Sequence, residues 1–235
     1  MLPLRRILVL CLLLAVLIFG WLNWRERSSQ QQLRVMPVPT IIKQPANVSS
    51  RTFDPANPPP DMPPLNPGEN AECVSDFTAD ANVAGQTLRT DATHGVVTLS
   101  RISLTLLLKI TIWVPTGVTQ RVIDHEDGHR QISEYYYQTA DKLAERIAAA
   151  YMGKQAEISG TDLNAESQKA LQQMAAEMSE EYERQLNSNP AQLLYDSITD
   201  HSRNDVVVQD AVDHALKNVS MESPQPASPE PSDPR

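Results

Sequence analysis

Proline is confined almost entirely to the two ends of this sequence, which limits where a packed domain can form. Ten of the eighteen prolines lie within residues 37–67 and five within residues 224–234, whereas only two lie within residues 68–220. Proline-rich segments bury too little apolar surface to order themselves. We therefore expect a proline-rich linker at residues 25–67 and a disordered tail at residues 221–235. One domain of about 150 residues remains at 68–220, long enough for a hydrophobic core.

An apolar run near the amino terminus sets a second boundary. Residues 7–24 are interrupted by only one glycine and one asparagine, and Arg5 and Arg6 precede them. As a helix this run spans about 27 Å, close to the hydrocarbon thickness of a bilayer. Because no convincing small-residue cleavage site follows, we predict that residues 1–24 form a signal-anchor, a single transmembrane helix. The expected location is a bacterial inner membrane with the domain in the periplasm, or export if the segment is cleaved.

Within the domain, apolar and other residues alternate with unusual regularity over residues 102–114. This period of two predicts a strand with one buried face, long enough to bend or to be two strands. A weaker strand candidate at residues 96–100 leads into it. The residues expected on the buried face are Ile102, Leu104, Leu106, Leu108, Ile110, Ile112 and Val114.

The pattern then changes to the period of a helix. Apolar residues and histidines recur at steps of three or four from Val118 to Tyr151, which predicts one long amphipathic helix. Thr116 is the expected N-cap, and Gly153 stands where a glycine often ends a helix. Further helices are predicted at residues 162–187 and 204–217. A small sheet packed on a long helix predicts an α+β fold.

The long helix carries the pattern His-Glu-x-x-His at residues 125–129. Two histidines four residues apart lie on one face of a helix, so both imidazoles can reach one metal ion. Glu126 follows the first ligand directly and can act as the general base on a water at the metal. Gly128 costs about 1 kcal/mol of helix propensity relative to alanine, so its position predicts a close approach of another backbone or of a substrate.

Two segments together resemble a family of bacterial secreted zinc-dependent proteases, a domain of unknown function with a His-Glu-x-Gly-His motif. They are a strand ending in Val114-Pro115 followed by the motif helix, and the later segment Tyr-Asp-Ser-Ile-Thr-Asp-His at residues 195–201. The resemblance covers roughly residues 73–203. It implies a zincin-like metallopeptidase domain, bound Zn²⁺ and a ligand at His201. The family often has glycine after that histidine, where this chain has Ser202.

A catalytic zinc takes three protein ligands and leaves one position for water. His125 and His129 are the first two, and His201 is the expected third because the family-like segment delivers it after a helix that can fold back. Tyr195 is a candidate hydrogen-bond donor to the oxyanion of the transition state, with a packed core tyrosine as the alternative. The other candidates for the third ligand are Glu157, Glu180, Glu181, His94 and His214.

These features predict a membrane-anchored zinc metallopeptidase, a hydrolase, that cleaves a protein or peptide substrate in the cell envelope. The alternative is a non-catalytic envelope binding or scaffold module with a structural or vestigial metal site. The net charge of −9 argues against nucleic acid as a partner. Cys73 is the only cysteine outside residues 7–24, so we expect a buried free thiol there rather than an intramolecular disulfide.

Overall fold

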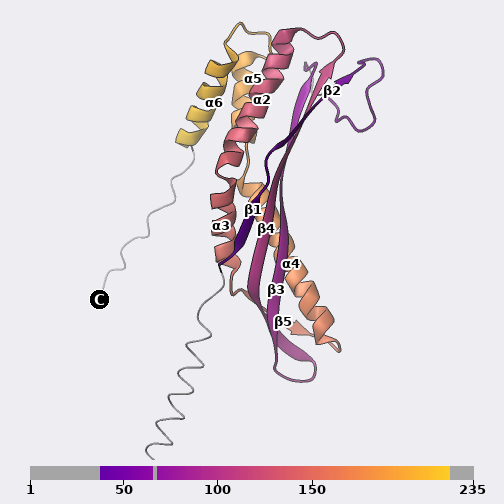
Figure 1. Cartoon of the computed structure of the whole chain (residues 1–235), viewed down its shortest axis with the longest axis vertical. Helices are drawn as coiled ribbons and strands as arrows, with labels where there is room; N and C mark the ends of the chain where they lie inside the picture. The colour runs from indigo at the N-terminus through magenta and orange to yellow at the C-terminus, as the bar shows by residue number, and fades with distance from the viewer. Residues whose placement is uncertain (1–37, 66–67, 223–235) are drawn as a thin grey trace, which may run out of the picture. The chain divides into compact units, whose positions relative to one another are not determined.

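The computed structural model describes residues 38–65 and 68–222 (Figure 1). The expected signal-anchor at residues 1–24 and the tail beyond residue 222 lie outside these ranges. Within them, no helix is both long and apolar enough to cross a bilayer. The described residues contain one five-stranded mixed sheet and five helices, which agrees with the predicted α+β class.

One long strand, β4 (His94–Pro115), organises the sheet. β3 (Glu72–Arg89) pairs with it in antiparallel fashion along one side. Three short strands share the other side. β5 (Gln155–Ser159) pairs antiparallel with the start of β4, whereas β1 (Thr40–Lys43) and β2 (Asn47–Phe53) pair parallel with its middle and its end. The sheet is therefore at most three strands wide, with β4 in the centre.

The predicted alternation along β4 matches its burial. The even-numbered residues from Ile102 to Val114 are buried, and before them Val97 and Leu99 are buried instead. The change of parity occurs at a β-bulge, where the register with β3 shifts and Ser100 is the extra residue. A bulge adds one residue to one strand, so the apolar face stays on the same side. The two strand candidates at residues 96–100 and 102–114 are therefore one bulged strand.

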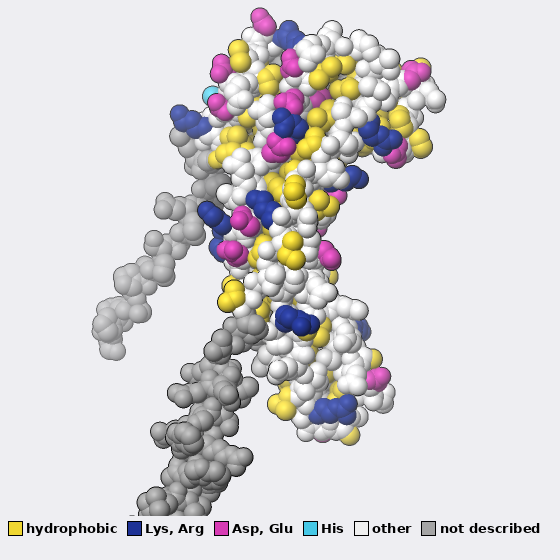
Figure 2. All heavy atoms as spheres, viewed as in Figure 1, with side chains coloured by type: hydrophobic (Ala, Val, Ile, Leu, Met, Phe, Trp, Pro, Cys, Tyr) yellow, Lys and Arg dark blue, Asp and Glu magenta, His cyan; other side chains and the backbone are white. Residues whose placement is uncertain are grey.

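Helices cover the apolar face of this sheet. α2 (Gln120–Gln138) and α4 (Leu163–Gln185) contact β3 and β4, and α3 (Ala140–Tyr151) contacts β1 and β4. The buried residues of β4, α3 and α4 form one continuous hydrophobic cluster between the two layers. On the view in Figure 2, acidic and basic side chains are interspersed over the described surface.

A second, smaller cluster lies on the other side of α2. α5 (Asn189–Thr199) and α6 (Val208–Glu222) pack against each other and against α2. Burial on two sides explains why α2 carries so few exposed residues along the motif. The buried members of this second cluster are Ile132, Ala191, Tyr195, Ala211, Val212 and Ala215.

The predicted helix over residues 118–151 is two helices. Thr139, with φ −102° and ψ 8°, separates α2 from α3. The break lets α3 follow the sheet at β1 and β4 while α2 also contacts α5 and α6. The N-cap position belongs to Thr119 rather than Thr116, whose hydroxyl instead donates to the Phe53 carbonyl at 3.1 Å. Gly153 has φ +81°, as expected for the glycine that ends a helix.

The carboxyl-terminal half contains one helix more than the sequence predicts. The segment predicted at 162–187 forms α4, and the one predicted at 204–217 begins later, at Val208, as α6. Between them, Pro190 stands in the first turn of α5. Proline both terminates a helix and fits the first turn of the next one, because no backbone N–H is needed there.

The proline-rich linker expected at residues 25–67 is wrong where the structure describes strands. β1 and β2 hydrogen-bond to one side of β4, and Phe53 at the end of β2 is only 5% exposed. The prolines separate these strands: Pro39 precedes β1, Pro45 lies between β1 and β2, and Pro55 follows β2. Edge strands tolerate nearby proline because their outer side makes no ladder hydrogen bonds. The folded domain therefore begins about thirty residues earlier than the composition predicts.

Truncating Phe53 tests this correction. Because its ring is buried, we expect Phe53→Ala to lower the free energy of unfolding by about 3 kcal/mol. Val48→Ala is the matched control, since Val48 lies in the same strand but is 43% exposed, and it should cost less than about 1 kcal/mol. Denaturant unfolding followed by circular dichroism gives both values. Equal, small effects would restore the linker interpretation.

Candidate metal centre

The two motif histidines lie on the inward face of α2, and their rings converge. Their Nε2 atoms are 3.2 Å apart, and the ring planes are nearly perpendicular at 87°. His125 is buried, and the side chain of His129 is only 12% exposed. Both imidazoles therefore face one point, as their spacing on the helix predicts.

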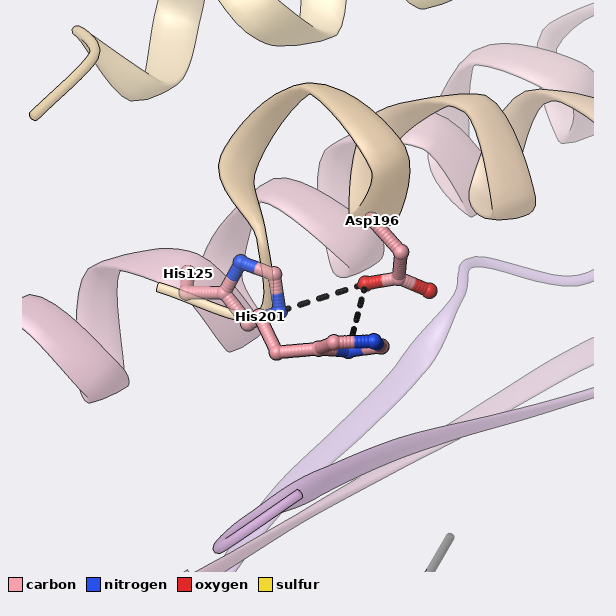
Figure 3. Close-up of side chains that lie close together, drawn as sticks. All are labelled: His125, Asp196 and His201. Atoms are coloured by element: carbon pink, nitrogen blue, oxygen red, sulfur yellow. Dashed lines mark ion pairs between the residues drawn. The ribbon is translucent and has the colours of Figure 1, made fainter. Parts of the chain in front are cut away.

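Asp196 on α5 brings a carboxylate oxygen to the same point. Its Oδ1 lies 3.0 Å from Nε2 of His129 and 3.4 Å from Nε2 of His125. His201, just beyond α5, places Nδ1 3.6 Å from that oxygen. The donor atoms of His125, Asp196 and His201 all lie within 4.8 Å of one another, so these residues form a group that could hold a metal ion (Figure 3).

The spacing of the donors fits a small cation with short bonds. Ligands placed about 2.0–2.1 Å from a tetrahedral zinc are roughly 3.3 Å apart. The three distances among His125, His129 and Asp196 are 3.2, 3.0 and 3.4 Å. Oδ1 of Asp196 is buried and makes no hydrogen bond of acceptable geometry within the described residues, despite these close nitrogens. A shared cation would satisfy that oxygen and both imidazoles at once.

A second layer of hydrogen bonds orients His129. Its Nδ1 is 2.6 Å from Oε1 of Gln192 on α5, which can accept the ring N–H. The Gln192 amide donates to Oγ of Ser133 at 2.9 Å and to the His129 carbonyl at 3.1 Å. Metal-binding histidines usually donate their other ring N–H in this way, which fixes the tautomer and leaves Nε2 with a free lone pair.

Gly128 allows α5 to approach α2 closely. A Cβ at this position would lie 2.2 Å from the hydroxyl oxygen of Tyr195 and 2.5 Å from its Cζ, which is far inside van der Waals contact. The Tyr195 ring stacks on His125, with centroids 5.1 Å apart, and its hydroxyl donates to the His125 carbonyl at 3.1 Å. The close approach predicted at Gly128 exists, but a side chain, that of Tyr195, makes it rather than another backbone or a substrate. This contact holds α5, and with it Asp196, close to the motif.

This geometry gives Tyr195 a different role from the expected oxyanion donor. Tyr195 is fully buried, its hydroxyl is already hydrogen-bonded to His125, and it does not line the cavity described below. Burial raises the pKa of its hydroxyl well above the ordinary value. The alternative, a packed core tyrosine, describes what the structure contains.

His201 is held on a strained turn. Asp200, His201 and Ser202 have φ values of 47°, 51° and 69°, a left-handed conformation that costs each side chain of this kind about 1 kcal/mol. Contacts on both sides hold the turn, including a hydrogen bond from Arg203 to the Gly68 carbonyl at 2.9 Å. The turn reverses the chain after α5 and returns His201 toward Asp196. Nδ1 of His201 also lies 3.5 Å from the carboxylate of Glu69.

A cavity of about 220 Å³ opens beside the converging donors, and we call it the site cavity. Its lining includes His125, Glu126 and His129 of α2, the start of β3, and α5 from its first turns to Asp196. Glu126 is only 4% exposed. Burial, helped by the nearby carboxylates and opposed by His129, raises the pKa of Glu126 to about 7.

The electrostatics of the donors favour one charge arrangement. Burial lowers the pKa of His125, which keeps that imidazole neutral and able to bind a metal. For Asp196, burial opposes ionisation, but the two imidazoles beside it hold the pKa of its carboxyl well below the ordinary range. His129 has a raised pKa because the attraction of Asp196 outweighs its burial. An anionic carboxylate between two imidazoles is an arrangement that attracts a cation.

The other ligand candidates lie elsewhere. None of them belongs to the metal-competent group found among the described residues. His94 is exposed and pairs with Asp91 at 3.0 Å, and Glu181 pairs with Arg184. The remaining three, on β5, α4 and α6, are all exposed and are Glu157, Glu180 and His214.

The sequence interpretation missed Asp196 and Gln192. Asp196 stands directly after Tyr195 within the family-like segment, so its position in that segment could have indicated a role. Gln192 and Asp196 lie four residues apart on α5, but this spacing had no meaning for the sequence analysis because α5 was not predicted. Cys73 lines the site cavity as a free thiol. Burial raises the pKa of Cys73 to about 12, which keeps it protonated and makes it a poor metal ligand.

Comparison with known proteins finds no relative of this chain. The chain matches no family model, no curated protein and no solved structure.

Replacing Gly128 tests the contact that joins α5 to the motif. Although alanine favours a helix, its Cβ would collide with Tyr195, so we expect Gly128→Ala to lower the free energy of unfolding by about 2 kcal/mol. Gly117→Ala is the control, because a Cβ there meets no atom within 4 Å and carries only the strain of φ +77°, about 1 kcal/mol. Thermal and denaturant unfolding measure both. A Gly128→Ala protein as stable as wild type would contradict the close approach.

Proposed function

We propose that this protein is a zinc-dependent peptidase. The observation that carries the proposal is the convergence of His125, His129 and Asp196 at one point. These residues line a cavity that is also lined by the buried carboxylate of Glu126. The donor set of imidazoles and one carboxylate is typical of catalytic zinc, which prefers four ligands at short distances. The resemblance to secreted zinc-dependent proteases and a zincin-like arrangement of the domain belong to the same proposal.

The bound zinc, Glu126 and Gln192 would have separate roles in the reaction. Zinc, when bound, polarises a carbonyl oxygen and makes a water molecule acidic enough to react at neutral pH. Glu126 takes a proton from the attacking water and delivers it to the leaving amine. Glu126 suits both steps because it is buried and lines the cavity beside the converging donors. Gln192 keeps the His129 ring in the orientation that presents Nε2.

His125, His129 and Asp196 lie within 3.4 Å of one another, and His201 lies nearby, with Nδ1 3.6 Å from Asp196. A catalytic zinc keeps one position exchangeable. We propose that Asp196 stays and that His201 is exchangeable. Asp196 lies on a regular helix with its side chain 17% exposed, whereas His201 lies on the strained turn with its side chain 31% exposed. His201, the third ligand expected from the sequence, then becomes a fourth donor that water or substrate replaces.

The position of His201 beside Asp196 favours a second candidate function. If His201 never leaves, the site is closed, as in structural zinc sites, and the protein is a binding or scaffold module. Both candidates place the domain in the cell envelope, attached through the apolar run at residues 7–24, with a protein or peptide as partner. They differ in whether Glu126 takes part in a reaction.

Replacing Glu126 separates the two functions. Because general acid–base catalysis contributes about a hundredfold to ten-thousandfold, we expect Glu126→Gln to lower kcat/KM for peptide cleavage by about a thousandfold while zinc content stays at the wild-type value. Glu134→Gln on the same helix is the control, since that carboxylate faces Arg130, and its activity should stay within twofold. Peptide hydrolysis and metal analysis of the purified protein measure both. Wild-type cleavage by Glu126→Gln would contradict the peptidase proposal.

Zinc affinities of single variants test the ligand assignment. We expect Asp196→Ala to weaken zinc binding by at least about 100-fold and His201→Ala by about tenfold, because only the former removes a permanent ligand. The double variant His125→Ala/His129→Ala should bind no zinc and sets the lower limit. Competition with a chromophoric chelator gives the constants. The reverse order of the two single variants would make His201 the third ligand.

A further inference from the structure

The site cavity is lined by four carboxylates, and the only basic side chains in its lining are the motif histidines His125 and His129. Its lining includes Glu69, Glu72, Glu126 and Asp196, but no lysine or arginine. Glu69 already faces His201 at 3.5 Å. Glu72, the first residue of β3, is the carboxylate that remains, because no lysine, arginine or histidine of the described chain forms an ion pair with it.

Glu72 is both partly buried and incompletely satisfied. Its Oε2 is inaccessible to solvent and has no hydrogen-bond partner among the described residues. Burial, together with the neighbouring Glu69, raises the pKa of Glu72 above its ordinary value. A buried carboxylate oxygen without a donor is costly, and a cation or hydrogen-bond donor supplied from outside would remove that cost.

Zinc does not supply this missing charge. The donors that would hold Zn²⁺ are His125, His129 and Asp196, and Glu72 is not among them. Glu72 is therefore left as a carboxylate that lines the cavity without an ion-pair partner among the described residues. The complementary group has to come from the molecule that enters.

We propose that the site cavity selects peptides that present a positively charged group, an ammonium or a guanidinium, next to the bond that is cleaved, and that Glu72 receives this group. The inference rests on the proposed peptidase function and adds the substrate class to it. Charge complementarity in a partly desolvated site gives specificity, because a neutral competitor leaves the buried carboxylate unpaired.

The walls around Glu72 suit the stem of such a side chain. Ala71 precedes Glu72, and Leu193 of α5, which is 63% exposed, also lines the cavity. Lysine and arginine bury their methylene stems against apolar surface while the charged end reaches a polar partner. Two sources provide the same chemistry, namely a lysine or arginine side chain and the free amino group at the start of a peptide.

Paired peptides test the inference on the full-length, zinc-loaded protein. A synthetic library with randomised central positions, analysed by mass spectrometry, first locates the cleaved bond and the flanking preferences. Matched peptides then carry lysine or norleucine at the selected position, each with a free or an acetylated amino terminus. We expect kcat/KM to be about tenfold or more higher for the charged member of a pair. The acetylated pairs show whether a side chain or the terminal amine supplies the charge.

Charge-removing variants connect the preference to Glu72. Glu72→Gln should reduce the ratio of charged to neutral kcat/KM to near one, mainly through KM. Asp80→Asn is the control, because Asp80 is exposed on the same strand and its loss changes the net charge equally; this variant should keep the wild-type ratio. Equal ratios in wild type and Glu72→Gln would overturn the inference while leaving the peptidase proposal intact.

A binding measurement covers the case in which no cleavage occurs. Calorimetric titration of the lysine and norleucine peptides into zinc-loaded Glu126→Gln reports the preference without turnover, and equal affinities overturn the inference. Metal analysis completes the test. A zinc content that falls from two ions per chain to one in Glu72→Gln would show that Glu72 binds a second metal ion and would likewise overturn it.

Discussion

The contact between Gly128 and Tyr195 is the constraint on which the candidate site depends. A side chain at position 128 would hold α5 away from α2, and Asp196 lies next to Tyr195 on that helix. With glycine there, the tyrosine ring stacks on His125 and its hydroxyl reaches the His125 carbonyl. One missing methyl group thus brings a carboxylate within 3.0–3.4 Å of both imidazoles. The helix propensity lost at glycine is a small cost beside the polar cluster that it permits.

The periodicity of apolar residues predicted the elements that have one buried face and one exposed face. β4 alternates because helices cover only one of its faces, and α4 is amphipathic because one of its sides packs on the sheet. β3 was not predicted: its core face includes small or polar residues such as Ser75, Ala79 and Ala81, so it lacks a clear period of two. Nor were β1 and β2, whose few residues are mostly exposed; their strand conformation depends on pairing with β4, which is distant in sequence.

The same distinction applies to the site. The spacing of His125 and His129 on one helix is a local property, so it indicated a shared ligand point. Asp196 reaches that point, and Glu69 and Glu72 reach the cavity beside it, only through the packing of α5 and the start of β3 against α2. No short-range pattern records this packing. Gly128 was the one residue whose local cost predicted a long-range contact, although the sequence did not identify its partner.

The acidic surroundings of Glu126 link its proposed chemistry to the selection of substrate. Burial contributes most to its raised pKa, and Asp196, Glu69 and Glu72 raise it further. These carboxylates repel one another in a partly desolvated cavity, which disfavours the folded arrangement until cations neutralise them. A metal ion at Asp196 relieves part of that repulsion, and a charged substrate at Glu72 relieves more. The carboxylates that raise the pKa of Glu126 are thus the same ones that favour a cation in the cavity, so the proposed catalysis and the proposed substrate preference would arise from one arrangement of charge.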